Sequence, residues 1–212
     1  GSRNYGLSLA KGGYIIFFDD DDFVHPLCLK YSMTALQSQN VDFCHYQKQS
    51  FLKDVPVIKV EELKIRRTLV REDIELVVTG EYALASCTVL WKKECFNHIK
   101  FKENLMYAEE WECYINIIEE GFKGVSLENV LYYNRKHAIS NTGKFWNSNP
   151  IQIQSKKEAI IIVANSLANK KILTSSVIKY FTGLAISYRD LSLLKELLIV
   201  SKSSVFFKIV TT

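Results

Sequence analysis

Tyr14-Ile15-Ile16-Phe17-Phe18-Asp19-Asp20-Asp21-Asp22 is an apolar run that ends in four adjacent carboxylates. Its five apolar residues are β-branched or aromatic, which predicts a buried strand of a parallel sheet. Ligand sites of α/β sheets lie beyond the carboxyl ends of such strands. Because the four Asp residues stand at that end, residues 19–22 are a candidate binding site.

Segments of both helical and extended character surround this run. Helices are expected at residues 2–10, 26–39, 92–98 and 109–120, and as two or three further segments from residue 150 onward. Strands are expected at residues 41–46, 86–91, 125–127 and 130–133, whereas residues 60–78 are charged and read as helical or mixed. Strands mixed with helices predict an α/β domain.

Cysteine usage and hydropathy restrict the setting. The chain has 212 residues and five Cys, an odd number without a Cys-x-x-Cys pair. A zinc site and a secreted disulfide framework are therefore not expected, and a reducing, cytoplasmic location fits better. No apolar stretch approaches the ~20 residues that span a bilayer.

Charge divides the chain near residue 148. Residues 1–148 carry 18 Lys and Arg against 20 Asp and Glu, while residues 149–212 carry 9 against 3. We predict a domain over residues 1–148 and a helical region over residues 149–212. The helices are expected to pack on that domain or on another subunit of a homo-oligomer, and the alternative is peripheral contact with anionic lipid at the inner membrane face. No nucleic-acid motif or long basic stripe is present, so no nucleic-acid partner is expected.

The four carboxylates allow two interpretations from their chemistry alone. Adjacent carboxylates repel one another, so a cation or a set of donors has to compensate them. Mg²⁺ and Mn²⁺ take oxygen ligands and are often shared between one or two carboxylates and substrate phosphates. The alternative is a solvated acidic turn in which Asp22 caps the following helix.

The surrounding residues carry a family resemblance. Ser2-Arg3-Asn4-Tyr5-Gly6-Leu7, Ala10-Lys11-Gly12-Gly13-Tyr14-Ile15 and Phe18-Asp19-Asp20-Asp21-Asp22 followed by Pro26 resemble family 2 glycosyltransferases of the GT-A fold. Members typically show the pattern ARNxGLxxAxGxYIxFxDxDDxxxP. Ser2 stands in place of the usual Ala, and Asp20 in place of a common Ser. The resemblance implies a GT-A-like (Rossmann-like) mixed sheet flanked by helices, with a helical C-terminal appendage.

The resemblance also implies roles for the acidic cluster. Asp19 and Asp21 would form the DxD motif that binds Mn²⁺ or Mg²⁺, with Asp21 as the direct ligand. Asp19 would face the ribose or support the metal, and Asp20 and Asp22 would shape the substrate site. Near the nucleotide the family places its Arg-Asn pair, which is Arg3-Asn4 here. Ordinary packing on a helix surface is the alternative for both, above all for Asn4.

A second acidic pair, Glu109-Glu110, opens the expected helix 109–120 and is followed by Trp111. The family often has Glu-Asp and an aromatic residue here, and the second acid acts as catalytic base. Glu110 stands where Asp is usual, so its carboxylate lies about one bond length further out, and Glu109 is the second candidate. The alternative is that both acids only favour the positive end of the helix. Trp111 is expected in the core or as a platform for the acceptor.

The stretch from Leu131 to Ser140, with Arg135 and His137, resembles the closing LYxYRxHxxS segment of the family. These two residues would contact the donor diphosphate or the metal, although such residues are also often structural. The family domain normally begins with about two βα units that bind base and ribose. Residues 1–140 match only its later part, so we expect an incomplete nucleotide pocket in this chain.

Together these features predict a glycosyltransferase. It would move a sugar from a nucleotide-diphosphate-sugar, of which a UDP-sugar is expected, to a saccharide or lipid-linked acceptor with inversion at the anomeric carbon. Bacterial surface polysaccharide synthesis is the setting that the resemblance implies. A phosphotransferase of the DxDx[TV] type is the second hypothesis, and Phe23 at the Thr/Val position counts against it. A non-catalytic carbohydrate-binding or scaffolding domain is the third.

Overall fold

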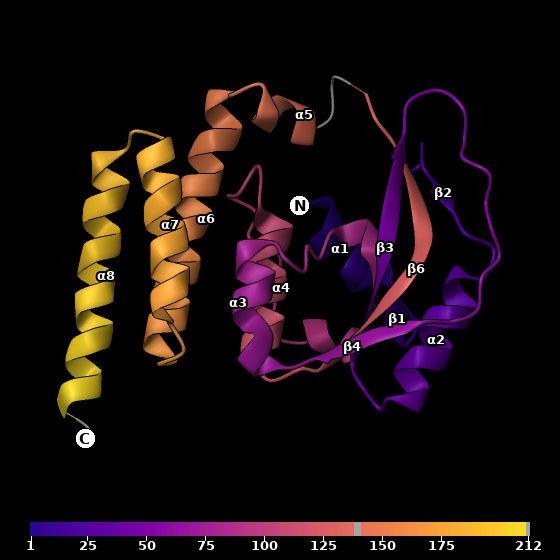
Figure 1. Cartoon of the computed structure of the whole chain (residues 1–212), viewed down its shortest axis with the longest axis horizontal. Helices are drawn as coiled ribbons and strands as arrows, with labels where there is room; N and C mark the ends of the chain where they lie inside the picture. Colours follow the sequence, from indigo (N-terminus) through magenta and orange to yellow (C-terminus); the bar gives the residue numbers. More distant parts are fainter. Residues whose placement is uncertain (138–140, 211–212) are drawn as a thin grey trace.

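A computed structural model describes residues 1–137 and 141–210 of the chain (Figure 1). Within these residues six strands form one mixed sheet. Five of them follow the order β1-β5-β3-β6-β2, and β4 pairs with β6 off this path. The strands are β1 (Tyr14–Ile15), β2 (Phe23–Val24), β3 (Phe43–Phe51), β4 (Ile65–Leu69), β5 (Val89–Lys92) and β6 (Gly124–Arg135).

The strand expected at residues 14–18 is shorter than predicted and differently paired. Only Tyr14 and Ile15 pair, and they pair antiparallel with β5 at the edge of the sheet. Phe18 leaves the sheet and stacks on Tyr132 with ring centroids 5.5 Å apart. The prediction of a buried parallel strand was therefore wrong, although the four carboxylates still follow its end.

The centre of the sheet is the parallel pair of β3 and β6. Their register runs from Phe43 opposite Gly124 to Phe51 opposite Arg135, with a shift around Gln47. The two short strands expected at residues 125–127 and 130–133 are thus one continuous strand. It ends at Arg135, so its carboxyl end carries the closing segment to the same edge as the acidic turn.

Helices cover both faces of the sheet. They are α1 (Ser2–Leu9), α2 (Cys28–Ser38), α3 (Ile74–Thr79) and α4 (Glu109–Glu119), together with short 3₁₀ turns at Arg71–Asp73, Ser86–Thr88 and Lys93–Phe96. One hydrophobic core lies between the sheet and α2 and contains Leu36, Cys44 and Leu127. A larger core on the opposite face contains Trp91, which stacks between Phe43 and Tyr114 at 4.7 Å.

The C-terminal region consists of α5 (Asn141–Trp146), α6 (Pro150–Asn169), α7 (Ser175–Ser187) and α8 (Leu191–Val210). Helix α6 begins where the Asn149 side chain accepts a hydrogen bond from the Ile151 N–H at 3.0 Å, with Pro150 in the first turn. Figure 1 shows α6 and α7 against α4 and α3, on the side away from α2, with α8 packed on the outer side of α6 and α7. Their apolar residues join the core that contains Trp91. The division at residue 148 stays a prediction, because this core continues across it.

None of the helices in the described ranges combines the length and the apolar character that a membrane crossing requires.

Candidate active site

The acidic turn at residues 19–22 is fastened to strand β6. The Asp19 N–H donates to the hydroxyl oxygen of buried Tyr132 at 3.1 Å. One carboxylate oxygen of Asp22 accepts the backbone N–H of Arg135 at 2.6 Å. Asp22 is therefore used to hold the turn in place, while the side chains of Asp19, Asp20 and Asp21 are exposed.

The end of β6 lies next to this turn. The Nε2 atom of His137 lies 3.2 Å from a carboxylate oxygen of Asp21. The Arg135 guanidinium donates to the backbone oxygens of Asp21 at 3.3 Å and Lys53 at 3.2 Å, and lies 4.8 Å from the Phe51 ring centroid. Arg135 thus fastens loops together as well as lining the cavity. The last three residues of the motif, Ala138 to Ser140, lie outside the described residues.

Charge accumulates at the turn. Partial burial raises the pKa of Asp19, and the neighbouring carboxylates of Asp22 and Asp21 raise it further, while Arg3 acts in the opposite direction. The ionised cluster therefore costs free energy, which a cation would offset.

The carboxylates of the acidic turn fit a cation shared with substrate phosphates better than a metal site made of protein ligands alone. Among the residues that the structure describes, no group of three or more His, Cys, Asp or Glu side chains is arranged to hold a metal. Mg²⁺ commonly keeps one or two carboxylates and completes its shell with phosphates and water. The exposed carboxylates of Asp21 and Asp19 fit that pattern.

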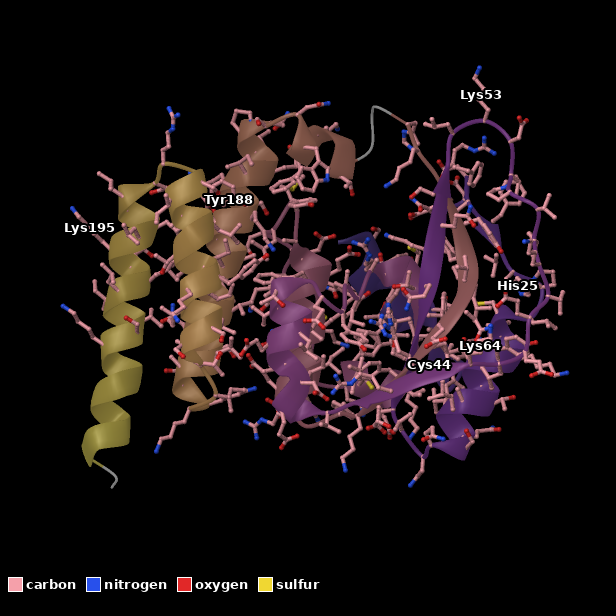
Figure 2. The ribbon with its side chains drawn as sticks, in the orientation of Figure 1. His25, Cys44, Lys53, Lys64, Tyr188 and Lys195 are labelled. Atoms are coloured by element: carbon pink, nitrogen blue, oxygen red, sulfur yellow. The ribbon has the colours of Figure 1, made fainter. Side chains whose placement is uncertain are left out.

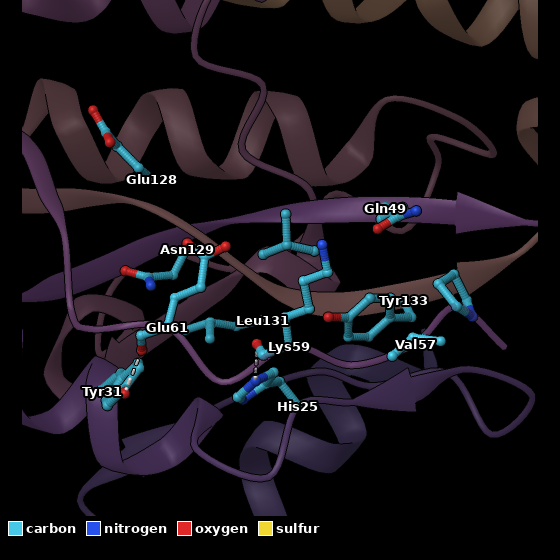
Figure 3. A pocket seen from close by; sticks show the side chains of 12 residues that line it. His25, Tyr31, Gln49, Val57, Lys59, Glu61, Glu128, Asn129, Leu131 and Tyr133 are labelled. Carbon is cyan, nitrogen blue, oxygen red and sulfur yellow. Dashed lines mark hydrogen bonds between the residues drawn. The ribbon is translucent and has the colours of Figure 1, made fainter.

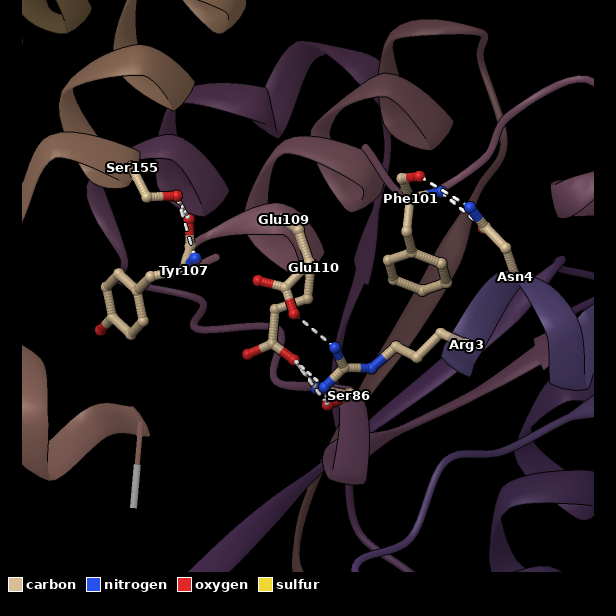
Figure 4. A network of polar contacts seen from close by, with 8 residues as sticks. All are labelled: Arg3, Asn4, Ser86, Phe101, Tyr107, Glu109, Glu110 and Ser155. Atoms are coloured by element: carbon tan, nitrogen blue, oxygen red, sulfur yellow. Dashed lines mark hydrogen bonds and ion pairs between the residues drawn. The ribbon is translucent and has the colours of Figure 1, made fainter. Parts of the chain in front are cut away.

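The second acidic pair opens α4, directly after Ala108 at φ 66°. A carboxylate oxygen of Glu110 accepts the hydroxyl of Ser86 at 2.5 Å and its backbone N–H at 3.2 Å. The Arg3 guanidinium donates to Glu109 and lies 3.6 Å from Glu110 (Figure 4). Both carboxylates are therefore held in place and partly neutralised from the N-terminal helix.

The two residues of the Arg-Asn pair have different environments. Arg3 lines the cavity, with its guanidinium on Glu109, Glu110 and, at 3.2 Å, the Ser86 hydroxyl. Asn4 points away: its side chain donates to the Phe101 carbonyl at 2.8 Å and accepts the Phe101 N–H at 3.0 Å (Figure 4). The alternative of ordinary packing on a helix surface therefore applies to Asn4, which does not line the cavity.

Trp111 lies on the helical side of the site. Its indole N–H donates to the Val78 carbonyl at 3.3 Å, and its ring meets Phe181 edge-on. The ammonium of Lys156, from α6, stands 3.4 Å from the ring centroid. One face of the indole is therefore covered by a lysine and cannot act as an open stacking platform in this arrangement.

One cavity of about 740 Å³ brings these groups together. Of the residues predicted from sequence, all except Asn4 line it: Arg3, Asp19, Asp20, Asp21, Asp22, Glu109, Glu110, Trp111, Arg135 and His137. Sequence reasoning missed Lys48, Ser86, Tyr107 and Lys156, which also line it. No local motif marks these four, because they reach the cavity only through long-range packing.

Helix α6 also holds the loop that leads into α4. The Ser155 hydroxyl accepts the Tyr107 N–H at 2.9 Å and donates to the Tyr107 carbonyl at 2.8 Å (Figure 4). The position of Glu109 and Glu110 therefore depends on contacts from the C-terminal region.

A second cavity, of about 490 Å³, lies on the other side of β6 (Figure 3). It is lined in part by the loop that precedes β4, and none of the predicted site residues borders it. His25, Tyr31 and Asn129 are bonded there to the backbone of residues 59–64. These side chains anchor the loop that borders the cavity.

The comparisons with known proteins agree with this geometry. The sequence model described as Glycosyl transferase family 2 matches residues 1–92. Over these residues the chain is similar to that family. The expected resemblance to family 2 glycosyltransferases is thereby confirmed over these residues.

A relative and several solved structures extend beyond this match. The amylovoran biosynthesis glycosyltransferase AmsB of Erwinia amylovora is 27% identical over 136 residues, which cover 62% of this chain and 44% of AmsB. The crystal structure of S. aureus TarS 1-349 in complex with UDP-GlcNAc has a TM-score of 0.65 and 17% identity, over 93% of this chain and 58% of that chain. A structure of S. aureus TarS has a TM-score of 0.60 and 15% identity, over 90% and 31%.

These structures share a mixed sheet flanked by helices, so the predicted GT-A-like fold is confirmed. The chain spans under half of AmsB and somewhat more than half of TarS 1-349. At this identity the TarS structures show the fold alone.

Proposed function

We propose that this protein transfers a sugar from a nucleotide-diphosphate-sugar, a UDP-sugar, to a saccharide or lipid-linked acceptor, with inversion at the anomeric carbon. One observation carries the proposal: the acidic turn at residues 19–22 and the pair Glu109-Glu110 face the same cavity. The UDP-GlcNAc complex of the structurally similar TarS 1-349 supports the choice of donor, and AmsB supports a role in polysaccharide synthesis.

In this proposal Glu110 is the general base. The acceptor hydroxyl has to lose its proton as its oxygen forms the bond to the anomeric carbon, while the bond from that carbon to the diphosphate breaks. The donors from Ser86 and Arg3 orient the Glu110 carboxylate for this step. Glu109, which Arg3 also holds, is the second candidate.

Asp21 and Asp19 would hold Mn²⁺ or Mg²⁺ on the opposite side of the cavity. A bound cation of this kind neutralises the negative charge that grows on the leaving diphosphate. His137 and Arg135 stand next to the same turn, where they would contact the phosphates. Asp22 would act only as a support, since its carboxylate is bonded to the backbone of Arg135.

The test is donor turnover by the full-length protein. We expect UDP-sugar hydrolysis and transfer with Mn²⁺, and a large loss of both in Asp21→Ala and Glu110→Gln. Asp54→Ala and Glu81→Gln are the matched controls, because both acids are exposed and outside the cavity lining. Unchanged turnover in the two site variants would refute the assignment, and UDP binding without turnover in the wild type would favour a scaffolding role.

For the setting we propose the cytoplasm of a bacterium, with residues 149–212 touching the inner membrane face. The five cysteines are free and buried, which suits a reducing compartment. The basic balance of residues 149–212 would attract anionic lipid. Co-sedimentation with anionic vesicles tests the contact, and protein that stays in the supernatant would count against it.

A further inference from the structure

Lys156 is a cation of the cavity that the proposed mechanism does not use. It lies on α6, and its ammonium stands 3.4 Å from the ring centroid of Trp111. Trp111 directly follows Glu110 in the first turn of α4. Lys156 therefore borders the part of the cavity where an acceptor hydroxyl would meet the general base.

The charge of Lys156 is not compensated by a carboxylate. Its neighbour Lys157 pairs with Asp190 at 2.7 Å, but among the described residues no acid lies at ion-pair distance from Lys156. Burial alone lowers the pKa of Lys156 to about 7. A partly buried ammonium whose neighbour is an aromatic face and not a carboxylate would attract an anion brought to it.

The cations of the cavity fall into two separate groups. Lys48, Arg135 and Lys136 stand on β3 and at the end of β6, near the acidic turn. Lys156 stands on α6, and Arg3 is engaged by Glu109 and Glu110. A donor diphosphate would use the first group, so Lys156 is left for a different anion.

We propose that Lys156 is the anion-binding residue of an acceptor subsite, and that the acceptor carries a phosphate or carboxylate group close to the hydroxyl that receives the sugar. The assignment to an acceptor rests on the proposed function, whereas the anion subsite itself does not. Trp111 would contribute the apolar surface beside the charge. An acceptor without such a group would leave the ammonium uncompensated and bind more weakly.

The first experiment measures the subsite with sulfate, whose charge does not change between pH 6 and pH 8. Calorimetric titration of the full-length protein is compared with Lys156→Met, which keeps the alkyl chain over Trp111 but loses the charge. We expect sulfate to bind about tenfold more weakly to Lys156→Met, as loss of one charge-assisted contact implies. Lys156→Arg should restore binding, and Lys195→Ala, on the outer side of α8 (Figure 2), should leave it unchanged.

The same titration has a pH signature. Sulfate should bind more tightly at pH 6 than at pH 8, and this difference should shrink in Lys156→Arg, since arginine stays charged. The other titratable groups that line the cavity are Asp19, Asp20, Asp21, Asp22, Lys48, Cys87, Tyr107, Glu109, Glu110, Lys136 and His137. They are common to all variants, so comparison with Lys156→Met isolates the lysine. Equal sulfate affinity in wild type and Lys156→Met would overturn the subsite.

The second experiment assigns the subsite to the acceptor. Transfer is measured to three glycosides that differ only in a neutral, a phosphate or a carboxylate substituent. We expect a lower acceptor KM for one of the anionic glycosides, which identifies the anion, and loss of that preference in Lys156→Met without a change in donor KM. Equal KM for all three glycosides would overturn the acceptor assignment while leaving transfer proven. Absence of all donor turnover would refute the proposed function, and the sulfate titration would still decide the subsite.

Discussion

Replacing Ser86 by Ala tests whether the carboxylate of Glu110 is held in place from outside its own helix. The Ser86 hydroxyl donates to Glu110 at 2.5 Å and accepts from Arg3 at 3.2 Å. A hydrogen bond to a charged group contributes ~1.5–3 kcal/mol. The Glu110 side chain is 31% exposed and keeps the Ser86 backbone N–H at 3.2 Å, so we take the lower end of this range.

The expected loss in the free energy of unfolding is therefore about 1.5 kcal/mol, or about 3–6 °C in Tm for a chain of this size. If Glu110 is the base, kcat/KM for transfer should fall about tenfold as well, because its orientation is loosened. Urea unfolding followed by circular dichroism gives the first quantity, and a transfer assay gives the second. Ser187→Ala is the control, since that exposed hydroxyl donates only to a carbonyl of its own helix.

A double-mutant cycle with Glu110→Leu makes the test specific. Once the carboxylate is gone, Ser86→Ala should cost about 1 kcal/mol less than in the wild type, because the two side chains interact directly. Unfolding free energies that add to within about 0.5 kcal/mol would refute the reasoning. The Ser86 hydroxyl would then have no effect on the Glu110 carboxylate, which would be oriented by Arg3 and its own helix alone.

Three further outcomes are expected. In Gly124→Ala, a Cβ would stand 2.1 Å from the ring of fully buried Phe43. We therefore expect the free energy of unfolding, measured in urea, to fall by about 1–3 kcal/mol. A stability equal to wild type would contradict the register of β3 and β6. Burial lowers the pKa of His45 from 6.5 to about 4, so the folded state favours the neutral imidazole. The contribution of His45 to the free energy of unfolding is therefore fully present above pH 6.5. It falls by up to about 3 kcal/mol as the pH drops to 4. His45→Gln should lose most of this acid sensitivity in unfolding curves measured from pH 7 to 4, and an identical profile would contradict it. In Asp21→Ala, Mn²⁺ affinity measured by calorimetry with UDP present should fall at least about tenfold, and Asp54→Ala should bind as the wild type does.

The acidic turn could be predicted from the sequence because its signal is local. Residues 2–26 carry a spaced motif, and four carboxylates after an apolar run mark the end of a strand. The extent of that strand could not be predicted in the same way. Phe17 and Phe18 are apolar because they pack on Phe101 and Tyr132 at the side of the sheet, and not because they pair within it.

Strand β4 is a second case in which tertiary contacts decide. Its sequence, Ile65-Arg66-Arg67-Thr68-Leu69, has three polar residues in a row and lacks the alternation of a half-buried strand. The structure places Arg66 and Arg67 over the ring of Tyr82, at 4.8 and 5.7 Å from its centroid. These contacts with a residue fifteen and sixteen positions away stabilise the strand, and no local pattern shows them.

The same limit applies to the site. Arg3 was placed near the nucleotide by its motif, yet its partners are Glu109 and Ser86, which are far away in the chain. Ser86 and Lys156 are single residues without a motif, and they become site residues only when the 3₁₀ turn and α6 pack around α4. The residues of the candidate cation site could be predicted, but the partners that position Glu110 could not.

The double hydrogen bond between Ser155 and Tyr107 has a consequence for how such a site can diverge. It fixes the loop before Glu109 to α6. A change in helical packing behind the cavity can therefore move Glu109 and Glu110 relative to the acidic turn. If the proposed transfer is correct, acceptor choice can change through substitutions that lie outside the cavity, while the residues at the acidic turn stay as they are. A graft of residues 1–148 onto foreign helices would preserve the motif and lose the alignment.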